Sequence, residues 1–306
     1  MKLTKPLFWQ SKNIISILLL PLTIVTLLIN ISKRIYPKKN FSIQTICIGN
    51  IFLGGTGKTS LAIEIKKLID KKFKTVFIKK NYQDQIDEIN LLKKRGDVVS
   101  KNNRESALHL ASKKYDLAIL DDGLQQKNIN YGLKIVCFNT KDGLGNEFLL
   151  PAGPLRESIG NLKDYDIAFL NGENKNKNLL IKLKSINKNL IIFEGKYKPE
   201  NLSKFNLSKK YLMFCGIGNP HEFEKTLKKY KFNITKKIIF PDHYKITPQE
   251  IKGLKSNAKN EGLTLITTEK DFFRLNKFER KNIKFLKIKL EVNNLKYFKK
   301  ILTSRI

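Results

Sequence analysis

The stretch SIQTICIGNIFLGGTGKTSLAIEI, residues 42–65, decides the fold. A β-branched run at 43–48 predicts a buried strand, and the pattern from Lys58 onward predicts a helix over 58–72. Between them lies GGTGKT, residues 54–59. Three glycines in four positions allow a tight turn that directs several backbone N–H groups inward, and the following helix adds its positive end. This stretch therefore predicts a strand, a phosphate-binding loop and a helix.

The residues of this loop suit a nucleotide. Lys58 can reach the β- and γ-phosphates, and the Thr59 hydroxyl can ligate Mg²⁺. The usual pattern starts with a glycine where this chain has Phe52, and we expect Gly49 to take that first turn. A glycine-rich connection without a ligand is the alternative. The predicted nucleotide-binding residues are Gly54, Gly55, Thr56, Gly57, Lys58, Thr59 and Ser60.

A second apolar run ends in acidic residues. YDLAILDDGLQ, residues 115–125, predicts a strand followed by Asp121, Asp122 and Gly123. The carboxyl ends of neighbouring parallel strands lie together, so we expect Asp121 or Asp122 to hold the Mg²⁺ that Thr59 also contacts. Asp-Asp-Gly turns are common in proteins. The prediction therefore depends on the pairing of this turn with the phosphate loop.

After residue 40, short apolar runs alternate with helical patterns. The expected strands are 43–48, 75–79, 116–120, 134–138, 166–170 and 190–193, then 211–215, 235–240 and 263–267. This alternation predicts an α/β fold: a P-loop NTPase-like, mostly parallel sheet with helices on both faces, and a second, smaller α/β domain. The expected parts are a membrane-associated segment at 1–38, a nucleotide-binding domain at 39–205 and a C-terminal domain at 206–306.

Residues 14–31 form an uncharged apolar run, IISILLLPLTIVTLLINI, between Lys12 and the pair Lys33 and Arg34. About 18 residues at a helical rise of 1.5 Å cover ~27 Å, close to the hydrocarbon thickness of a bilayer. A signal peptide is one alternative, but no small-x-small cleavage site follows. A buried soluble helix is another, but charges flank the run without entering it. We expect a membrane helix that either crosses the bilayer or lies in it.

The chain of 306 residues carries a net charge of +32, with 59 Lys and Arg against 27 Asp and Glu. Such a surplus attracts nucleic acid, acidic lipid or phosphorylated substrates. The basic residues are nearly all lysines, spread among Asn and Ile, whereas nucleic-acid-binding proteins concentrate arginines and aromatic residues in one stripe. We therefore expect no nucleic-acid partner. Cys47, Cys137 and Cys215 lie far apart in apolar runs, which favours buried thiols over a zinc site.

Five motifs occur in an order that resembles the tetraacyldisaccharide 4'-kinase family. They are GGTGKT, DDGLQ, LLPAGPLRE at 149–157, FPDHY at 240–244 and TTEKD at 267–271. The resemblance covers nearly the whole chain. It implies two α/β domains and ATP-dependent phosphorylation of the 4'-hydroxyl of a lipid A disaccharide precursor, a tetraacyldisaccharide 1-phosphate, to give lipid IVA. It also implies catalytic domains on the cytoplasmic side of the inner membrane. A glycolipid substrate accounts for a membrane segment on a P-loop enzyme.

The resemblance also implies roles for particular residues. The family's proton-accepting Asp corresponds to Asp87, in IDEI, and its supporting His corresponds to His243, in FPDHY. The implied catalytic residues are thus Asp87, His243 and Lys58, and the implied nucleotide contacts outside the loop are Tyr82, Arg104 and Arg156. Arginines suit phosphate because their planar group donates two parallel hydrogen bonds.

The chain departs from the family pattern in the region that contains Asp87. Lys79-Lys80-Asn81-Tyr82-Gln83 stands where the family has Ser-Arg-Gly-Tyr-Gly, and Ile86 and Ile89 flank Asp87 and Glu88 in place of Gly and Pro.

One alternative function is a membrane-tethered regulatory P-loop ATPase. That class carries a signature lysine where this chain has Leu53. Another is a basic, membrane-anchored adaptor with a degenerate loop.

Overall fold

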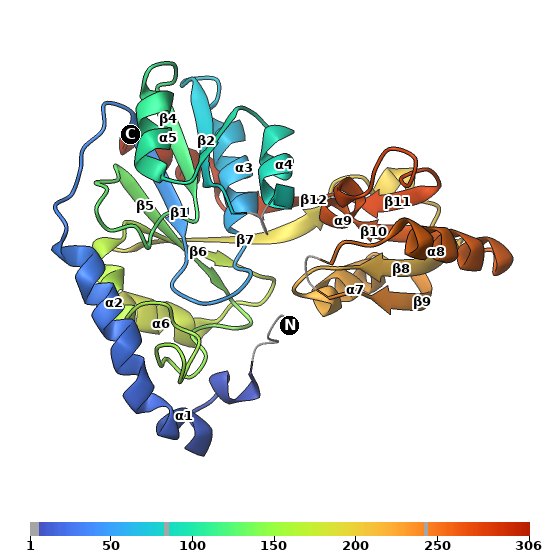
Figure 1. The fold of residues 1–306 in the computed structure, drawn as a ribbon, viewed down its shortest axis with the longest axis horizontal. Helices are drawn as coiled ribbons and strands as arrows, with labels where there is room; N and C mark the ends of the chain where they lie inside the picture. Colours follow the sequence, from blue (N-terminus) through green and yellow to red (C-terminus); the bar gives the residue numbers. More distant parts are fainter. Residues whose placement is uncertain (1–5, 83–85, 242–243) are drawn as a thin grey trace. The chain divides into compact units, whose positions relative to one another are not determined.

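A computed structural model describes residues 6–82, 86–241 and 244–306, with the backbone alone at Asp87. The chain forms two compact units (Figure 1). The larger unit is built from Leu3–Tyr82, Leu92–Tyr197 and Leu290–Ile306, and the smaller unit includes Gln83–Leu91 and Lys198–Lys289. The sequence pattern predicts a C-terminal domain at 206–306. In the structure, residues 290–306 belong to the larger unit.

The larger unit is organised around an eight-stranded sheet of order β12-β7-β6-β5-β1-β4-β2-β3. Its strands are β1 (Gln44–Gly49), β2 (Thr75–Lys80), β3 (Val98–Lys101), β4 (Leu117–Asp121), β5 (Leu133–Asn139), β6 (Ile167–Asn171), β7 (Ile191–Pro199) and β12 (Ile288–Val292). The pairs from β3 across to β7 are all parallel. β1 pairs with β4 on one side and β5 on the other, so the loop that follows β1 leaves from the middle of the sheet.

Helices cover both faces of this sheet (Figure 1). They are α3 (Lys58–Ile69), α5 (Arg104–Ser112), α6 (Lys177–Ile186) and α10 (Leu295–Ser304). Most of α4 (Ile86–Lys93) belongs instead to the Gln83–Leu91 segment of the smaller unit. One buried cluster joins the apolar sides of α3 and α10 to the sheet, and a second joins those of α5 and α6. Strands covered on both faces must be apolar throughout, which explains why β1, β4 and β5 read as nearly continuous apolar runs.

The smaller unit repeats this plan on a four-stranded parallel sheet of order β11-β10-β8-β9. Its strands are β8 (Lys210–Cys215), β9 (Asn233–Ile239), β10 (Thr264–Thr268) and β11 (Ile283–Leu286), and its helices are α7 (Pro220–Lys229), α8 (Pro248–Asn260) and α9 (Glu269–Arg274). Apolar residues of α7 and of α8 lie in two separate buried clusters. The predicted α/β fold with a smaller second α/β part is thus confirmed.

The apolar N-terminal run forms several short elements. They are η1 (Leu7–Trp9), α1 (Ile14–Leu18), η2 (Leu20–Leu22) and α2 (Thr23–Ile35). Pro21 lies at the start of η2, where α1 has already ended. Across 6–82, 86–241 and 244–306, none of the helices combines the length and apolar character that crossing a bilayer requires.

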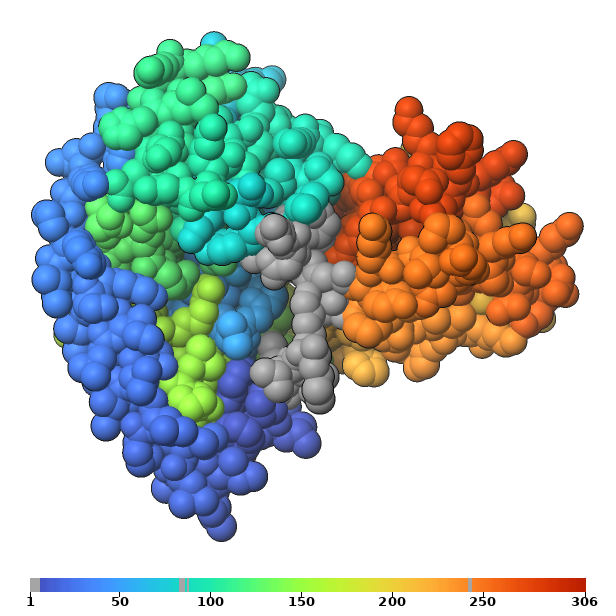
Figure 2. Space-filling view, in the orientation of Figure 1, coloured from blue at the N-terminus to red at the C-terminus, as the bar shows by residue number. Residues whose placement is uncertain are grey.

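Polar side chains hold α2 against the larger unit. The Thr26 hydroxyl donates to the Leu150 carbonyl at 2.7 Å, and the Asn30 amide donates to the Arg156 carbonyl at 2.9 Å. Large apolar side chains of the N-terminal elements are instead exposed to solvent. They include Leu7, Ile14, Leu18, Ile24, Val25, Leu28 and Ile35. The N-terminal residues form a continuous blue strip along one edge of the larger unit (Figure 2).

Candidate active site

The glycine-rich loop ends at Gly57, where α3 begins. Gly57 has φ of +88°, a left-handed conformation that glycine adopts without strain. A Cβ atom there would lie 2.5 Å from Asn171 Nδ2 and 2.7 Å from the Tyr197 hydroxyl oxygen. The same hydroxyl donates to Ser60 Oγ at 3.2 Å. Asn171, at the end of β6, and Tyr197, in β7, thus pack against the loop at Gly57. The sequence did not predict these two contacts.

The first half of the loop rests on the LLPAGPLRE segment. Leu53 N–H donates to the Pro154 carbonyl at 2.8 Å, and Arg156 N–H donates to the Ile51 carbonyl at 2.7 Å. Phe52, at the position where a glycine is usual, is buried in the core beside this segment. A phenylalanine is tolerated there because its side chain packs into a buried apolar cluster of the larger unit. The motif therefore supports the phosphate loop.

Asp121 ends β4 and is completely buried. Its Oδ2 accepts hydrogen bonds from Thr59 Oγ1 and from Lys79 Nζ, both at 2.8 Å. Its Oδ1 is buried without a hydrogen-bond partner among the described residues. The structure thus brings together Thr59 and Asp121, as the pairing of the two motifs predicted. Lys79, at the end of β2, was not among the predicted site residues.

Asp122 has φ of +63°, which turns its carboxylate toward cationic side chains. Its Oδ1 lies 3.0 Å from an Arg156 guanidinium nitrogen and 3.7 Å from Lys58 Nζ. Arg104 donates to the Asp122 carbonyl at 2.6 Å. Burial opposes ionisation of Asp122, but the Lys58 ammonium and the Arg156 guanidinium outweigh it and hold its pKa well below the usual range. The carboxylate is therefore ionised at neutral pH.

These side chains form a donor set that suits magnesium. Carboxylate and hydroxyl oxygens are the ligands that Mg²⁺ prefers. Thr59, Asp121 and Asp122 provide them at the end of the phosphate loop, and Asp121 Oδ1 remains available for a further interaction. The residues thus fit both groups that the sequence predicted, a nucleotide phosphate at the loop and a magnesium ion beside it.

Glu157 anchors the supporting segment. It is 1% exposed, pairs with Lys127 Nζ at 2.7 Å and accepts from the Tyr165 hydroxyl at 2.6 Å. Burial, together with the neighbouring Glu157 carboxylate, raises the pKa of Tyr165 well above its usual value. Gln125, from the DDGLQ motif, donates to the Asn50 carbonyl at 2.7 Å. Gln125 Nε2 also donates to Glu157 Oε1 at 3.4 Å, and this contact joins the DDGLQ and LLPAGPLRE motifs.

Other predicted residues lie elsewhere or outside the described part of the chain. Tyr82 follows β2, is 40% exposed and has its ring 4.9 Å from Lys80 Nζ. His243 and the side chain of Asp87 lie outside the described residues. TTEKD, in the smaller unit, forms a helix cap in which Thr268 Oγ1 accepts from the Asp271 N–H at 3.1 Å.

Comparisons with known proteins agree on one family. The family model for Tetraacyldisaccharide-1-P 4'-kinase matches residues 15–306. A protein of Pelagibacter ubique named Tetraacyldisaccharide 4'-kinase is 45% identical over 302 residues, which are 97% of this chain and 96% of that protein. One of the same name from Rickettsia akari is 34% identical over 96% of this chain and 94% of its own length.

A solved structure has the same fold. It is a crystal structure of LpxK from Aquifex aeolicus in complex with ATP, with a TM-score of 0.74 and 24% identity. The alignment covers 95% of this chain and 99% of that chain, so the similarity extends over both units of the fold.

Proposed function

Since the chain belongs to the tetraacyldisaccharide 1-phosphate 4'-kinase family, we propose that it transfers the terminal phosphoryl group of ATP to the 4'-hydroxyl of a tetraacyldisaccharide 1-phosphate. The product is lipid IVA. The observation that carries this proposal is the geometry at the end of β1, where Gly57, Lys58 and Thr59 begin α3 beside Asp121 and Asp122. A kinase needs this combination of phosphate-binding amides, a lysine and hard oxygen ligands.

Phosphoryl transfer depends mainly on positioning and on neutralising charge. The amides of the loop and Lys58 hold the phosphates of ATP. Thr59, Asp121 and Asp122 would hold Mg²⁺, which would supply neutralisation of the phosphate charge. Arg156 orients the Asp122 carboxylate through their 3.0 Å ion pair, and so keeps it fixed beside Lys58.

The sugar hydroxyl must lose its proton during the transfer. We assign this proton to Asp87, with His243 supporting that carboxylate, as the family pattern implies. The assignment predicts that His243→Ala lowers kcat strongly and changes the Kd for ATP little. If ATP affinity fell and kcat did not, His243 would be a nucleotide-binding residue instead.

We assign the enzyme to the cytoplasmic side of the inner membrane, where ATP and the lipid precursor meet. Support comes from the N-terminal elements, whose polar side chains attach to the larger unit while Leu18, Leu28 and Ile35 are exposed. Lys33 and Arg34, in the last turn of α2, suit an anionic lipid surface. Replacing Leu18 and Leu28 by Ser should reduce sedimentation with anionic vesicles, and unchanged sedimentation would contradict this assignment.

The acceptor assay tests the proposed reaction. Purified protein is given labelled ATP, Mg²⁺ and a tetraacyldisaccharide 1-phosphate in detergent micelles, and phosphate in the lipid is counted. We expect transfer that requires the acceptor and is abolished by Lys58→Ala. ATP hydrolysis that ignores the acceptor would instead favour a membrane-tethered regulatory ATPase. An absence of ATP binding would favour an adaptor with a degenerate loop.

A further inference from the structure

Lys79 is a buried lysine beside the predicted metal-binding carboxylates. It is 2% exposed, and its Nζ lies 2.8 Å from Asp121 Oδ2, the oxygen that also accepts from Thr59 Oγ1. A buried ammonium group is costly unless it is paired. The pair with Asp121 satisfies that requirement, and it places an ammonium group against the carboxylate to which we assign Mg²⁺.

Three cationic side chains contact the two carboxylates. Lys58 and Arg156 pair with Asp122, and Lys79 pairs with Asp121. A fixed cation in a buried site attracts phosphate oxygens and repels a metal ion, because the Coulomb energy is large where water is excluded. One lysine therefore acts on the two ligands in opposite directions.

We propose that Lys79 is a positioning residue that supplies a built-in positive charge at Asp121 and so lowers the amount of Mg²⁺ that this chain needs to bind the phosphates of ATP. The inference rests on the proposed function, since it takes ATP as the ligand. It requires that ATP binds measurably in the absence of metal, and that Lys79 holds the affinity of the site for the divalent cation down.

The test is calorimetry of ATP binding with excess EDTA and with saturating Mg²⁺. The ratio of the two dissociation constants measures how strongly nucleotide binding depends on the metal. Lys79→Met removes one charge, so it should weaken metal-free binding and raise this ratio by roughly tenfold. Mn²⁺ bound to the protein–ATP complex, followed by electron paramagnetic resonance, should bind more tightly in Lys79→Met. Lys79→Arg should restore the wild-type ratio.

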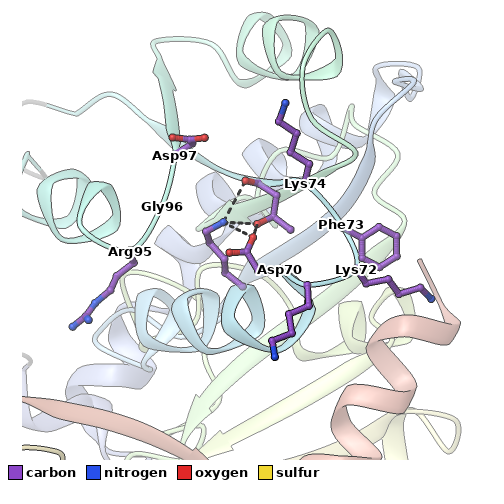
Figure 3. Close-up of a pocket in the computed structure, with 10 residues that line it drawn as sticks. Asp70, Lys72, Phe73, Lys74, Arg95, Gly96 and Asp97 are labelled. Carbon is purple, nitrogen blue, oxygen red and sulfur yellow. Dashed lines mark hydrogen bonds and ion pairs between the residues drawn. The ribbon is translucent and has the colours of Figure 1, made fainter.

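Lys66→Met is the matched control, because Lys66 is also a buried lysine paired with an aspartate. It is 7% exposed, and its Nζ lies 2.7 Å from Asp70 Oδ1 and 2.6 Å from Thr75 Oγ1. These residues line a surface cavity of about 510 Å³ (Figure 3). The cavity lies at the start of β2, whereas the phosphate loop follows the end of β1 in the same parallel sheet. Lys66→Met should destabilise the fold and leave the metal dependence of ATP binding unchanged.

A second variant keeps the test decisive if Lys79→Met does not fold. Lys79→Gln retains a hydrogen-bond donor for Asp121 and loses the charge, so it should raise the ratio as Lys79→Met does. A ratio within twofold of wild type in the charge-free variant would overturn the inference, as would an equal change in Lys66→Met. If the wild-type chain bound no ATP even with Mg²⁺, the proposed function would fail and this inference with it.

Discussion

Gly57→Ala probes how closely β6 and β7 approach the phosphate loop. Alanine at φ of +88° is strained by ~1–2 kcal/mol. Its Cβ would also lie 2.5 Å from Asn171 Nδ2 and 2.7 Å from the Tyr197 hydroxyl oxygen, and such overpacking costs about 1–3 kcal/mol. Together the two effects predict a loss of about 2–5 kcal/mol in the free energy of unfolding of the larger unit.

Two other glycines separate these contributions. Gly262 has φ of +63° with nothing within 4 Å of the position that a Cβ atom would take, so Gly262→Ala should cost only the backbone strain of ~1–2 kcal/mol. Gly55 has open space around its Cβ position and no left-handed φ, so Gly55→Ala should change stability by less than about 0.5 kcal/mol. Of these three substitutions, Gly57→Ala alone combines the two costs.

The assay is urea unfolding of the full chain, followed by circular dichroism and by intrinsic fluorescence. A calorimetric titration with Mg²⁺ and ATP then measures the nucleotide site, where displacement of Asn171 or Tyr197 by Gly57→Ala should weaken binding at least tenfold. If Gly57→Ala unfolded within about 0.5 kcal/mol of wild type and bound ATP normally, the close packing of the loop against β6 and β7 would be refuted.

Three further predictions concern the surroundings of the site and the smaller unit. The lowered pKa of Asp122 means that its carboxylate stabilises the fold above about pH 4, and that this stability is lost as the pH falls below that value. The difference in unfolding free energy between wild type and Asp122→Asn should therefore shrink in acid. A difference that stays constant with pH would contradict this role of the carboxylate. Glu157→Gln leaves Lys127 without its ion-pair partner and should cost about 3 kcal/mol, while adding Lys127→Met should recover part of that loss in urea unfolding. Thr268→Ala removes the cap of α9 and should cost about 1 kcal/mol, which Thr268→Ser restores; equal stability of the two variants would count against the cap.

Much of the fold could be predicted from local patterns. Strands buried on both faces must be apolar along their whole length, so β1, β4 and β5 were evident as short β-branched runs. The phosphate loop was evident because glycines and Lys-Thr follow the first of these strands. The meeting of Thr59 with Asp121 followed from a general property of parallel sheets, whose carboxyl ends share one edge.

What could not be predicted depends on contacts between distant segments. Lys79 was only a departure from the family pattern, because nothing in its neighbourhood in sequence indicates that it is buried against Asp121. The packing of Asn171 and Tyr197 on Gly57 likewise joins strands that lie far apart along the chain. In the N-terminal run, hydropathy predicted one long helix, whereas the polar anchors that attach Thr26 to the larger unit are set by tertiary structure.

The division of the larger unit along the chain has a consequence for its synthesis. β12 and α10 complete the sheet and the face of α3, and Phe298 and Leu302 are fully buried there. A ribosome releases them only after the whole of Lys198–Lys289. Phe169 and Phe193, next to Phe298 in the native state, therefore stay uncovered until the last residues of the chain have been made. At this stage the nascent chain exposes apolar side chains, and we expect chaperones to bind to them.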